Sequence, residues 1–197
     1  GQEVGYSEDS KNPAEFLINK YVKPGKNVLT LKIFRWSTGS YLECQDFWRI
    51  SGIERDVYLY SQPKVAIKDF RVTSTLDNTY KNGIFKLTMD IRNTGSQTSK
   101  DYIIGYKVFD PKTNKVIAES EKNSAFNANS TISLFGHTEI EIPDVKTWTS
   151  EHPNLYKLLM YIKEGEKIVE MVPFNIGFRR IEIKPIEQKA ANGQPYV

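Results

Sequence analysis

The sequence has little of what marks several classes of protein. Cys44 is the only cysteine, so no intrachain disulfide can form. Because bacterial periplasmic proteins also often lack disulfides, the periplasm and the cytoplasm both stay open. The longest apolar runs span only a few residues, far short of the roughly 20 that cross a bilayer. The 27 basic residues are scattered and form no long block of like charge. We therefore expect no membrane partner and no nucleic-acid partner.

Motifs for catalysis and metal binding are equally scarce. The two histidines, His137 and His152, have no partners at metal-ligand spacing. The chain contains neither a G-x-S-x-G nucleophile motif nor a glycine-rich phosphate loop. We expect no catalytic or metal-binding role for either histidine, and no serine-hydrolase chemistry.

What the sequence has instead is alternation of apolar and polar residues with a period of two. In "IFKLTMDIR", Phe85, Leu87, Met89 and Ile91 fall on one face of an extended chain. "DYIIGYKVF" repeats this pattern, and "LYKLLMYIK" is apolar enough for a central strand. "DPKTNK", residues 110–115, is typical of a hairpin loop. No window shows a convincing helical stripe, so we predict an all-β fold.

Three segments can be distinguished along the chain. Pro63 separates two strand candidates and predicts a domain boundary. Residues 63–183 contain about seven or eight strand candidates with turns between them, which is enough for an immunoglobulin-like β-sandwich. Residues 1–62 offer about three or four, too few to close a sandwich. These candidates include residues 14–18, 27–34 and 55–60. Residues 184–197 lose the alternation and are expected to form a connector.

One segment, "SYLECQDFWRISGIERDV" at residues 40–57, combines aromatic and acidic side chains. Phe47 and Trp48 are costly to leave in water, whereas Glu43 and Asp46 are costly to bury beside them. Two acids at i and i+3 meet only on a helix, which the local pattern does not favour. The two carboxylates are therefore not expected to act as a catalytic pair.

Five stretches resemble, in this order, glycoside hydrolase family 2. They are "VGYSEDSKNPAEF", "RWSTGSYLECQDFWRISGIERDVYLY", "WTSEHPNLY", "NIGFRRIEI" and "NGQPYV". The "RWS-GSYLE-QD-WR" pattern is similar to the β-galactosidase branch, whereas β-glucuronidases and β-mannosidases share only the "SGI-R-V" and "GFR-I" ends. The resemblance implies that residues 1–62 are the C-terminal part of a jelly-roll sugar-binding domain. Residues 63–183 would then be the immunoglobulin-like β-sandwich that follows it. Residues 184–197 would lead to a (β/α)8 catalytic barrel that the chain does not contain.

The resemblance also implies a function in carbohydrate metabolism. The intact enzyme would be a hydrolase that removes terminal non-reducing β-D-galactose residues with retention, using two glutamates of the barrel. This chain would then be a non-catalytic fragment, inactive alone, with no catalytic residue and no cofactor of its own. In the galactosidases the acid that matches Asp46 contacts galactose directly and through a sodium ion. Asp46 is therefore the expected substrate-binding and metal-binding residue, and magnesium is a second ion expected in the intact enzyme.

Other residues of these motifs are expected to be structural. Trp36 and Trp48 are expected to pack in a core, and Arg179 to pair the sandwich with the barrel through its planar guanidinium. The residues expected in the core of the sandwich are Trp148, Pro153 and Tyr156.

Two other interpretations stay open. The chain could be a stand-alone carbohydrate-binding or adhesion module, or a fragment of a family 2 enzyme with another β-glycoside specificity, such as a glucuronide. The partners expected from the resemblance are a β-galactoside and the catalytic barrel of the same polypeptide. The strands of residues 1–62 have too few partners, so we expect them to stay partly disordered or to self-associate through their edges.

Overall fold

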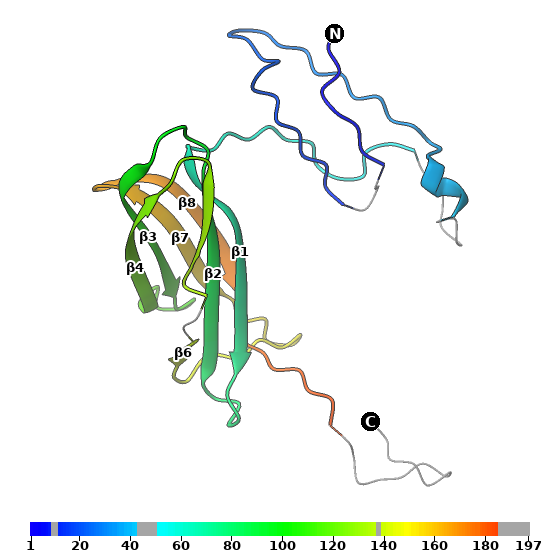
Figure 1. Ribbon diagram of the computed structural model, residues 1–197. Helices are drawn as coiled ribbons and strands as arrows, with labels where there is room; N and C mark the ends of the chain where they lie inside the picture. Colours follow the sequence, from blue (N-terminus) through cyan, green and yellow to red (C-terminus); the bar gives the residue numbers. More distant parts are fainter. Residues whose placement is uncertain (9–11, 43–50, 137–138, 185–197) are drawn as a thin grey trace, which may run out of the picture. The chain divides into compact units, whose positions relative to one another are not determined.

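The computed structural model describes residues 1–8, 12–42, 51–136 and 139–184 (Figure 1). The chain divides into two units, Gly1–Leu59 and Tyr60–Val197. Within the described residues, no helix has the length and apolar character needed to cross a membrane.

The first unit contains almost no regular structure among its described residues. Its one named element is a short 3-10 helix, η1 (Thr38–Tyr41), which begins where the N–H of Ser37 donates to Oγ of Ser40 at 2.9 Å. The strands predicted at residues 14–18, 27–34 and 55–60 are not formed, so this part of the prediction is wrong. A strand requires a hydrogen-bonded partner, and the described residues of this unit supply none.

The second unit is a sandwich of two antiparallel sheets, and the prediction of an all-β fold is confirmed there (Figure 1). In the first sheet β2 pairs with β1 on one side, and β5 and β6 pair with successive parts of β2 on the other. Its strands are β1 (Val65–Leu76), β2 (Gly83–Asn93), β5 (Ser130–Leu134) and β6 (Glu139–Ile142). The second sheet has the order β4-β3-β7-β8. Its strands are β3 (Ser99–Phe109), β4 (Val116–Phe126), β7 (Tyr156–Glu164) and β8 (Lys167–Ile176). The chain changes sheet after β2, β4 and β6, as in immunoglobulin-like sandwiches.

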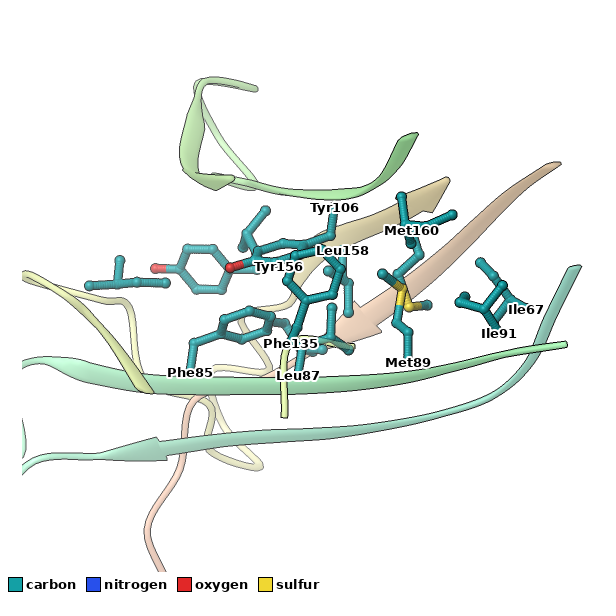
Figure 2. Close-up of a cluster of buried hydrophobic side chains, with 14 of the residues drawn as sticks. Ile67, Phe85, Leu87, Met89, Ile91, Tyr106, Phe135, Tyr156, Leu158 and Met160 are labelled. Atoms are coloured by element: carbon teal, nitrogen blue, oxygen red, sulfur yellow. The ribbon is translucent and has the colours of Figure 1, made fainter. Parts of the chain in front are cut away.

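The core lies between the inner faces of the two sheets (Figure 2). The alternation predicted for β2 is confirmed, because Phe85, Leu87, Met89 and Ile91 are all 2% exposed or less. The facing sheet contributes residues of β3 and β7, namely Ile104, Tyr106, Val108, Leu158, Met160 and Ile162. The strand predicted to be central, β7, does lie between β3 and β8.

Local sequence explains the two hairpins of the second sheet. Between β3 and β4 the carboxylate of Asp110 accepts the N–H groups of Lys112 and Thr113, at 2.9 and 2.7 Å, which confirms the predicted loop at residues 110–115. Between β7 and β8 the chain turns at Gly165, whose φ of +57° lies in the left-handed region that glycine tolerates.

Candidate functional site at the end of the sandwich where the chain leaves

The residue predicted to bind galactose and sodium, Asp46, lies outside the described residues. Glu43, Trp48 and His137 lie outside them too. The prediction for Asp46 therefore stays a prediction. Across the part of the chain that the structure describes, no group of three or more His, Cys, Asp or Glu residues could hold a metal ion.

Trp36 was expected in a core, and this prediction is wrong. The side chain is 55% exposed, and the guanidinium of Arg35 lies over its ring, 5.5 Å from the ring centre. A tryptophan on an apolar strand is buried only when a second sheet covers it. The described residues of the first unit form no such sheet.

Two motifs that are far apart in the sequence, "WTSEHPNLY" and "NIGFRRIEI", meet at one end of the sandwich. Thr147 and Phe178 form an isolated parallel bridge, and the N–H of Trp148 donates to the carbonyl oxygen of Phe178 at 2.9 Å. The guanidinium of Arg179 lies 5.0 Å from the centre of the Trp148 ring. The pair that Arg179 was predicted to make with a barrel involves no described residue and stays a prediction.

The core at this end is closed by aromatic side chains. Tyr156 is 2% exposed, as predicted, and its ring packs edge-on against Phe178 with centres 5.2 Å apart. Its hydroxyl accepts the N–H of Lys146 at 2.7 Å, while burial raises the pKa of the phenol. Trp148 is only half-buried, and Pro153 is exposed, so the core position predicted for Pro153 is wrong. Pro153 instead forms a bridge with Trp148 on the surface loop.

His152 has a structural role in the same loop. Its N–H donates to Oγ1 of Thr149 at 2.9 Å, and its carbonyl oxygen accepts the N–H of Thr149 at 3.0 Å. The side chain is exposed, and no set of possible metal ligands gathers around it within the described ranges.

The chain that leaves β8 is tied to β1. The hydroxyl of Ser74 donates to the carbonyl oxygen of Gly177 at 2.9 Å, and the N–H of Arg179 donates back to the carbonyl of Ser74 at 3.5 Å. A Cβ on Gly177 would lie 3.0–3.1 Å from the Trp148 side chain. The absence of a side chain at position 177 therefore lets the outgoing chain pass close to Trp148.

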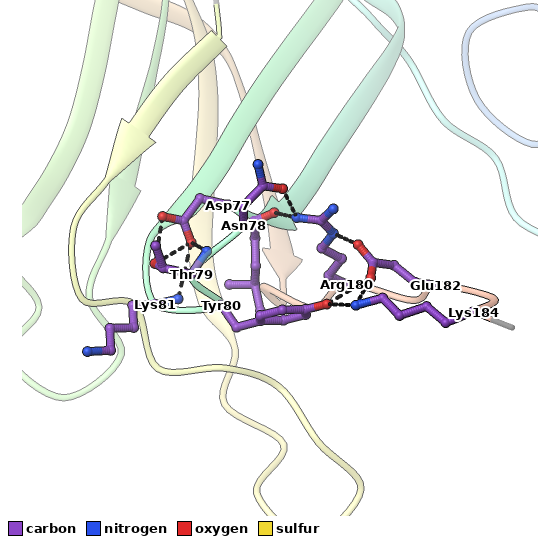
Figure 3. Close-up of polar contacts among 9 residues, drawn as sticks. Asp77, Asn78, Thr79, Tyr80, Lys81, Arg180, Glu182 and Lys184 are labelled. Carbon is purple, nitrogen blue, oxygen red and sulfur yellow. Dashed lines mark hydrogen bonds and ion pairs between the residues drawn. The ribbon is translucent and has the colours of Figure 1, made fainter. Parts of the chain in front are cut away.

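The loop between β1 and β2 lies beside this outgoing chain (Figure 3). The carboxylate of Asp77 accepts the N–H groups of Thr79, Lys81 and Asn82 at 3.1–3.3 Å, and so fixes the loop from within. Burial acts to raise the pKa of Asp77, but the hydrogen bond from the Thr79 hydroxyl and those from the three N–H groups together lower it. The loop presents Tyr80 with a φ of +59°.

Tyr80 and the outgoing chain form a polar cluster (Figure 3). The hydroxyl of Tyr80 donates to Oε2 of Glu182 and accepts from Nζ of Lys184, both at 2.7 Å. Glu182 also pairs with Lys184 at 2.6 Å and with Nε of Arg180. Arg180 in turn donates from Nη1 to Oδ1 of Asn78 at 2.8 Å. We call these five residues, Asn78, Tyr80, Arg180, Glu182 and Lys184, the exit cluster.

The charges of the exit cluster favour attachment of the outgoing segment to the β1–β2 loop rather than catalysis. Hydrogen bonds from Lys184 and then Tyr80 lower the pKa of Glu182 to about 2, and those to Glu182 and Tyr80 raise the pKa of Lys184. A general acid needs a pKa near the working pH, whereas this carboxylate is ionised throughout the neutral range. The exit cluster is therefore suited to hold the outgoing segment in place.

Sequence reasoning did not find the exit cluster. The D-x-T pattern of Asp77 and Thr79 does indicate a turn. Nothing local indicates that this turn contacts residues 180–184, more than 100 positions later.

Comparison with known proteins identifies the family to which this architecture belongs. The sequence matches the family described as glycosyl hydrolases family 2, sugar binding domain, over residues 1–63, and glycosyl hydrolases family 2 over residues 65–179. The two matches cover the first unit and the immunoglobulin-like sandwich that follows it in the sequence. The chain therefore belongs to glycosyl hydrolase family 2.

Relatives in this family are β-galactosidases. The β-galactosidase of Priestia megaterium is 42% identical over 186 residues, which cover 93% of this chain and 18% of that protein. The β-galactosidase of Streptococcus thermophilus is 39% identical over 184 residues, covering 93% and 17%. The chain spans less than a fifth of the length of these relatives. Among solved structures, a β-glucuronidase of Bacteroides uniformis has a TM-score of 0.60 at 16% identity, covering 68% of this chain and 17% of that one. That similarity shows the fold alone.

Proposed function

We propose that this chain is a non-catalytic part of a β-galactosidase that hydrolyses terminal non-reducing β-D-galactose residues with retention. The observation that carries the proposal is the identity of 42% and 39% to two β-galactosidases across 93% of the chain. A retaining glycosidase needs two carboxylates about 5–5.5 Å apart. The exit cluster has a single carboxylate, and it is held ionised between cations. The catalytic pair would come from the remainder of the whole protein.

In this proposal Asp46 is the residue through which the chain reaches the substrate. A carboxylate offers acceptors to sugar hydroxyls and a hard oxygen ligand to a sodium ion. One carboxylate is a suitable ligand but an incomplete set, so further ligands for sodium, and all ligands for magnesium, would come from elsewhere in the whole protein. The aromatic neighbour Phe47 would exclude water from the bound sugar.

The second contribution of the chain would be mechanical. The sandwich has a continuous core and binds its outgoing segment through the exit cluster. It can therefore act as a spacer that fixes where the polypeptide after residue 184 begins.

The first test compares two purified proteins on a chromogenic β-galactoside. The 197-residue chain should release no chromophore above the buffer rate, whereas the longer protein from the same gene should turn over steadily. In the longer protein Asp46→Ala should lower kcat/KM by roughly 10²-fold. The matched control Asp56→Ala, an exposed acid in the same part of the sequence, should leave kcat/KM unchanged. Steady hydrolysis by the 197-residue chain, or equal effects of the two substitutions, would contradict the proposal.

The sodium contact has a test that does not depend on activity. If Asp46 helps to bind sodium, sodium chloride should raise the Tm of the longer protein more than equimolar potassium chloride does. Asp46→Ala should remove this difference and Asp56→Ala should keep it. A parallel assay with a chromogenic β-glucuronide tests the alternative specificity, and faster turnover of the glucuronide would replace galactose as the proposed substrate.

A further inference from the structure

We infer that the side chain of Tyr80 holds the outgoing chain against the β1–β2 hairpin. The hairpin thereby sets the direction in which the polypeptide leaves the sandwich. The inference concerns residues 180–184, and its consequence for catalysis rests on the function proposed above.

The backbone at Tyr80 gives the first reason. Its φ of +59° lies in the left-handed region, which glycine and asparagine adopt readily and which is disfavoured for a bulky residue such as tyrosine. Such conformations persist where the surrounding structure fixes them and the side chain is put to use. Here the carboxylate of Asp77 fixes the loop, through hydrogen bonds to Thr79, Lys81 and Asn82. All of these hydrogen bonds lie within the loop, so none of them depends on the outgoing chain.

The contacts of the Tyr80 side chain give the second reason. One hydroxyl donates to Glu182 and accepts from Lys184, so both hydrogen-bonding capacities of the phenol are directed to the outgoing chain. The guanidinium of Arg180 and the ammonium of Lys184 lie 5.5 and 5.3 Å from the centre of the ring (Figure 3). A glycine or asparagine at this position would suit the backbone but would supply neither the ring nor the phenol.

The arrangement of charges gives the third reason. Arg180 and Lys184 lie on either side of Glu182 in the sequence, and both pair with its carboxylate. The side chains of Arg180 and Glu182 are only 27% and 22% exposed, so water screens this pair less than it screens a pair on an open surface. Arg180 extends the attachment to Oδ1 of Asn78, so the loop holds the outgoing chain at two points. Contacts at both Tyr80 and Asn78 fix the direction of the outgoing chain, whereas a single contact would let that chain rotate about it.

The first experiment measures the order of the outgoing chain by NMR relaxation of the 197-residue protein. Backbone order parameters at residues 181–184 should be about 0.8 in the unmodified chain and fall below about 0.6 in Tyr80→Ala. Tyr80→Phe keeps the ring and should give an intermediate value. The control Tyr102→Phe removes a hydrogen bond to Glu164 elsewhere in the sandwich and should leave residues 181–184 unchanged. Order parameters that do not change in Tyr80→Ala would overturn the inference.

A third variant separates loss of the side chain from damage to the loop. Tyr80→Gly suits the positive φ and should leave the unfolding midpoint of the sandwich unchanged or slightly higher. It should nevertheless loosen residues 181–184 as much as Tyr80→Ala does. Ordered residues 181–184 in Tyr80→Gly would show that the backbone of the loop, and not the Tyr80 side chain, holds the outgoing chain, and would overturn the inference.

The consequence for catalysis is tested in the longer protein. Tyr80→Gly should lower kcat for a chromogenic β-galactoside by roughly 10-fold or more with a smaller change in KM, because misplacing a catalytic part by about an ångström is costly. An unchanged kcat would overturn the orienting role. If the unmodified longer protein hydrolyses no galactoside, the proposed function fails, and the order parameters alone then decide whether Tyr80 fastens the chain.

Discussion

The phenol ring of Tyr161 on β7 lies directly over Gly105 on the neighbouring strand β3. The two residues are paired in the sheet, and a Cβ on Gly105 would lie only 2.5 Å from Cζ of Tyr161. The ring is 3% exposed, and its hydroxyl donates to Oε1 of Glu121 on β4 at 2.6 Å. Burial, followed by this hydrogen bond, raises the pKa of the phenol. The tyrosine thus covers the glycine and links three strands on the outer face of the sheet.

Gly105→Ala should therefore destabilise the sandwich. The added methyl group would displace a ring that is held at both ends, and overpacking of this kind costs about 1–3 kcal/mol. Urea denaturation monitored by circular dichroism would measure the loss in the free energy of unfolding. Lys107→Ala, on the same strand, breaks only a surface pair with Glu119 and should cost under about 1 kcal/mol. Equal midpoints for Gly105→Ala and the unmodified chain would contradict this reading of the Tyr161 contact.

A second prediction concerns Asn93. Among the residues that the structure describes, it is the only buried one with a polar side chain other than tyrosine. Its Nδ2 donates to the carbonyl oxygens of Gln97, Phe126 and Asn127 at 3.1–3.2 Å, and Oδ1 accepts the N–H of Gly95 at 2.8 Å. Asn93→Asp would place a charged acceptor against these carbonyl oxygens.

We expect Asn93→Asp to cost about 3 kcal/mol or more at pH 7, because it leaves a buried charge without a partner. The loss should shrink as the pH falls and the new carboxyl group is protonated. The control Asn123→Asp changes the same residue type at an exposed position and should shift stability by no more than about 0.5 kcal/mol. Denaturation curves at pH 7 and pH 4 would measure both effects, and a loss independent of pH would argue against a buried charge.

Glu170 holds the edge where the chain enters the sandwich. Its Oε2 accepts the N–H of Ile67 at 2.6 Å, where the register of β1 shifts, and its Oε1 accepts from Nε2 of Gln62 at 3.0 Å. Glu170→Ala leaves the N–H of Ile67 buried without this acceptor and should cost about 1–3 kcal/mol. Glu170→Gln keeps an acceptor and should cost less than half as much. Thermal unfolding would measure both, with the exposed Glu166→Ala as the control.

Which of these features could be read from the sequence depends on the range of the interaction. The alternation in β2 identified Phe85, Leu87, Met89 and Ile91 as core, because one strand carries its own period. The Asp110 loop is likewise local. The contact between Tyr80 and Glu182 joins residues more than 100 positions apart, and neither neighbourhood contains a signal of the other.

The predictions of a strand at residues 27–34 and of a buried Trp36 were wrong for a related reason. Alternation shows that a segment fits a sheet, and strand propensity describes packing on neighbours. It does not show that the neighbours are in the same chain. Leu31 and Ile33, which lie on one face of the alternating segment at residues 27–34, are 48% and 49% exposed.

The pKa of Glu182 predicts how the exit cluster depends on pH. The carboxyl group has a pKa of about 2 in the folded chain against an ordinary value of 4.5. A lowered pKa means that the contribution of the ionised group to stability is complete above about pH 4.5 and is lost as the pH falls toward 2. A carbon-13 NMR titration of the Glu182 carboxyl should give a midpoint near 2. Lys184→Met should raise this midpoint, since Lys184 is the main cause of the shift. A midpoint near 4.5 in the unmodified chain would exclude the cluster in solution.

The exposed apolar side chains of the first unit predict self-association of the 197-residue chain. Val28, Leu29 and Phe34 are 81%, 64% and 61% exposed in a segment that alternates as a strand would. Extended segments with unsatisfied backbone groups and an apolar face pair readily with other chains. Light scattering should therefore show a mass that rises with concentration. Leu29→Lys should shift the equilibrium toward monomer, whereas the exposed control Lys26→Ala should not. A strict monomer at all concentrations, with full amide protection across residues 28–35, would mean that these residues find their strand partners within one chain.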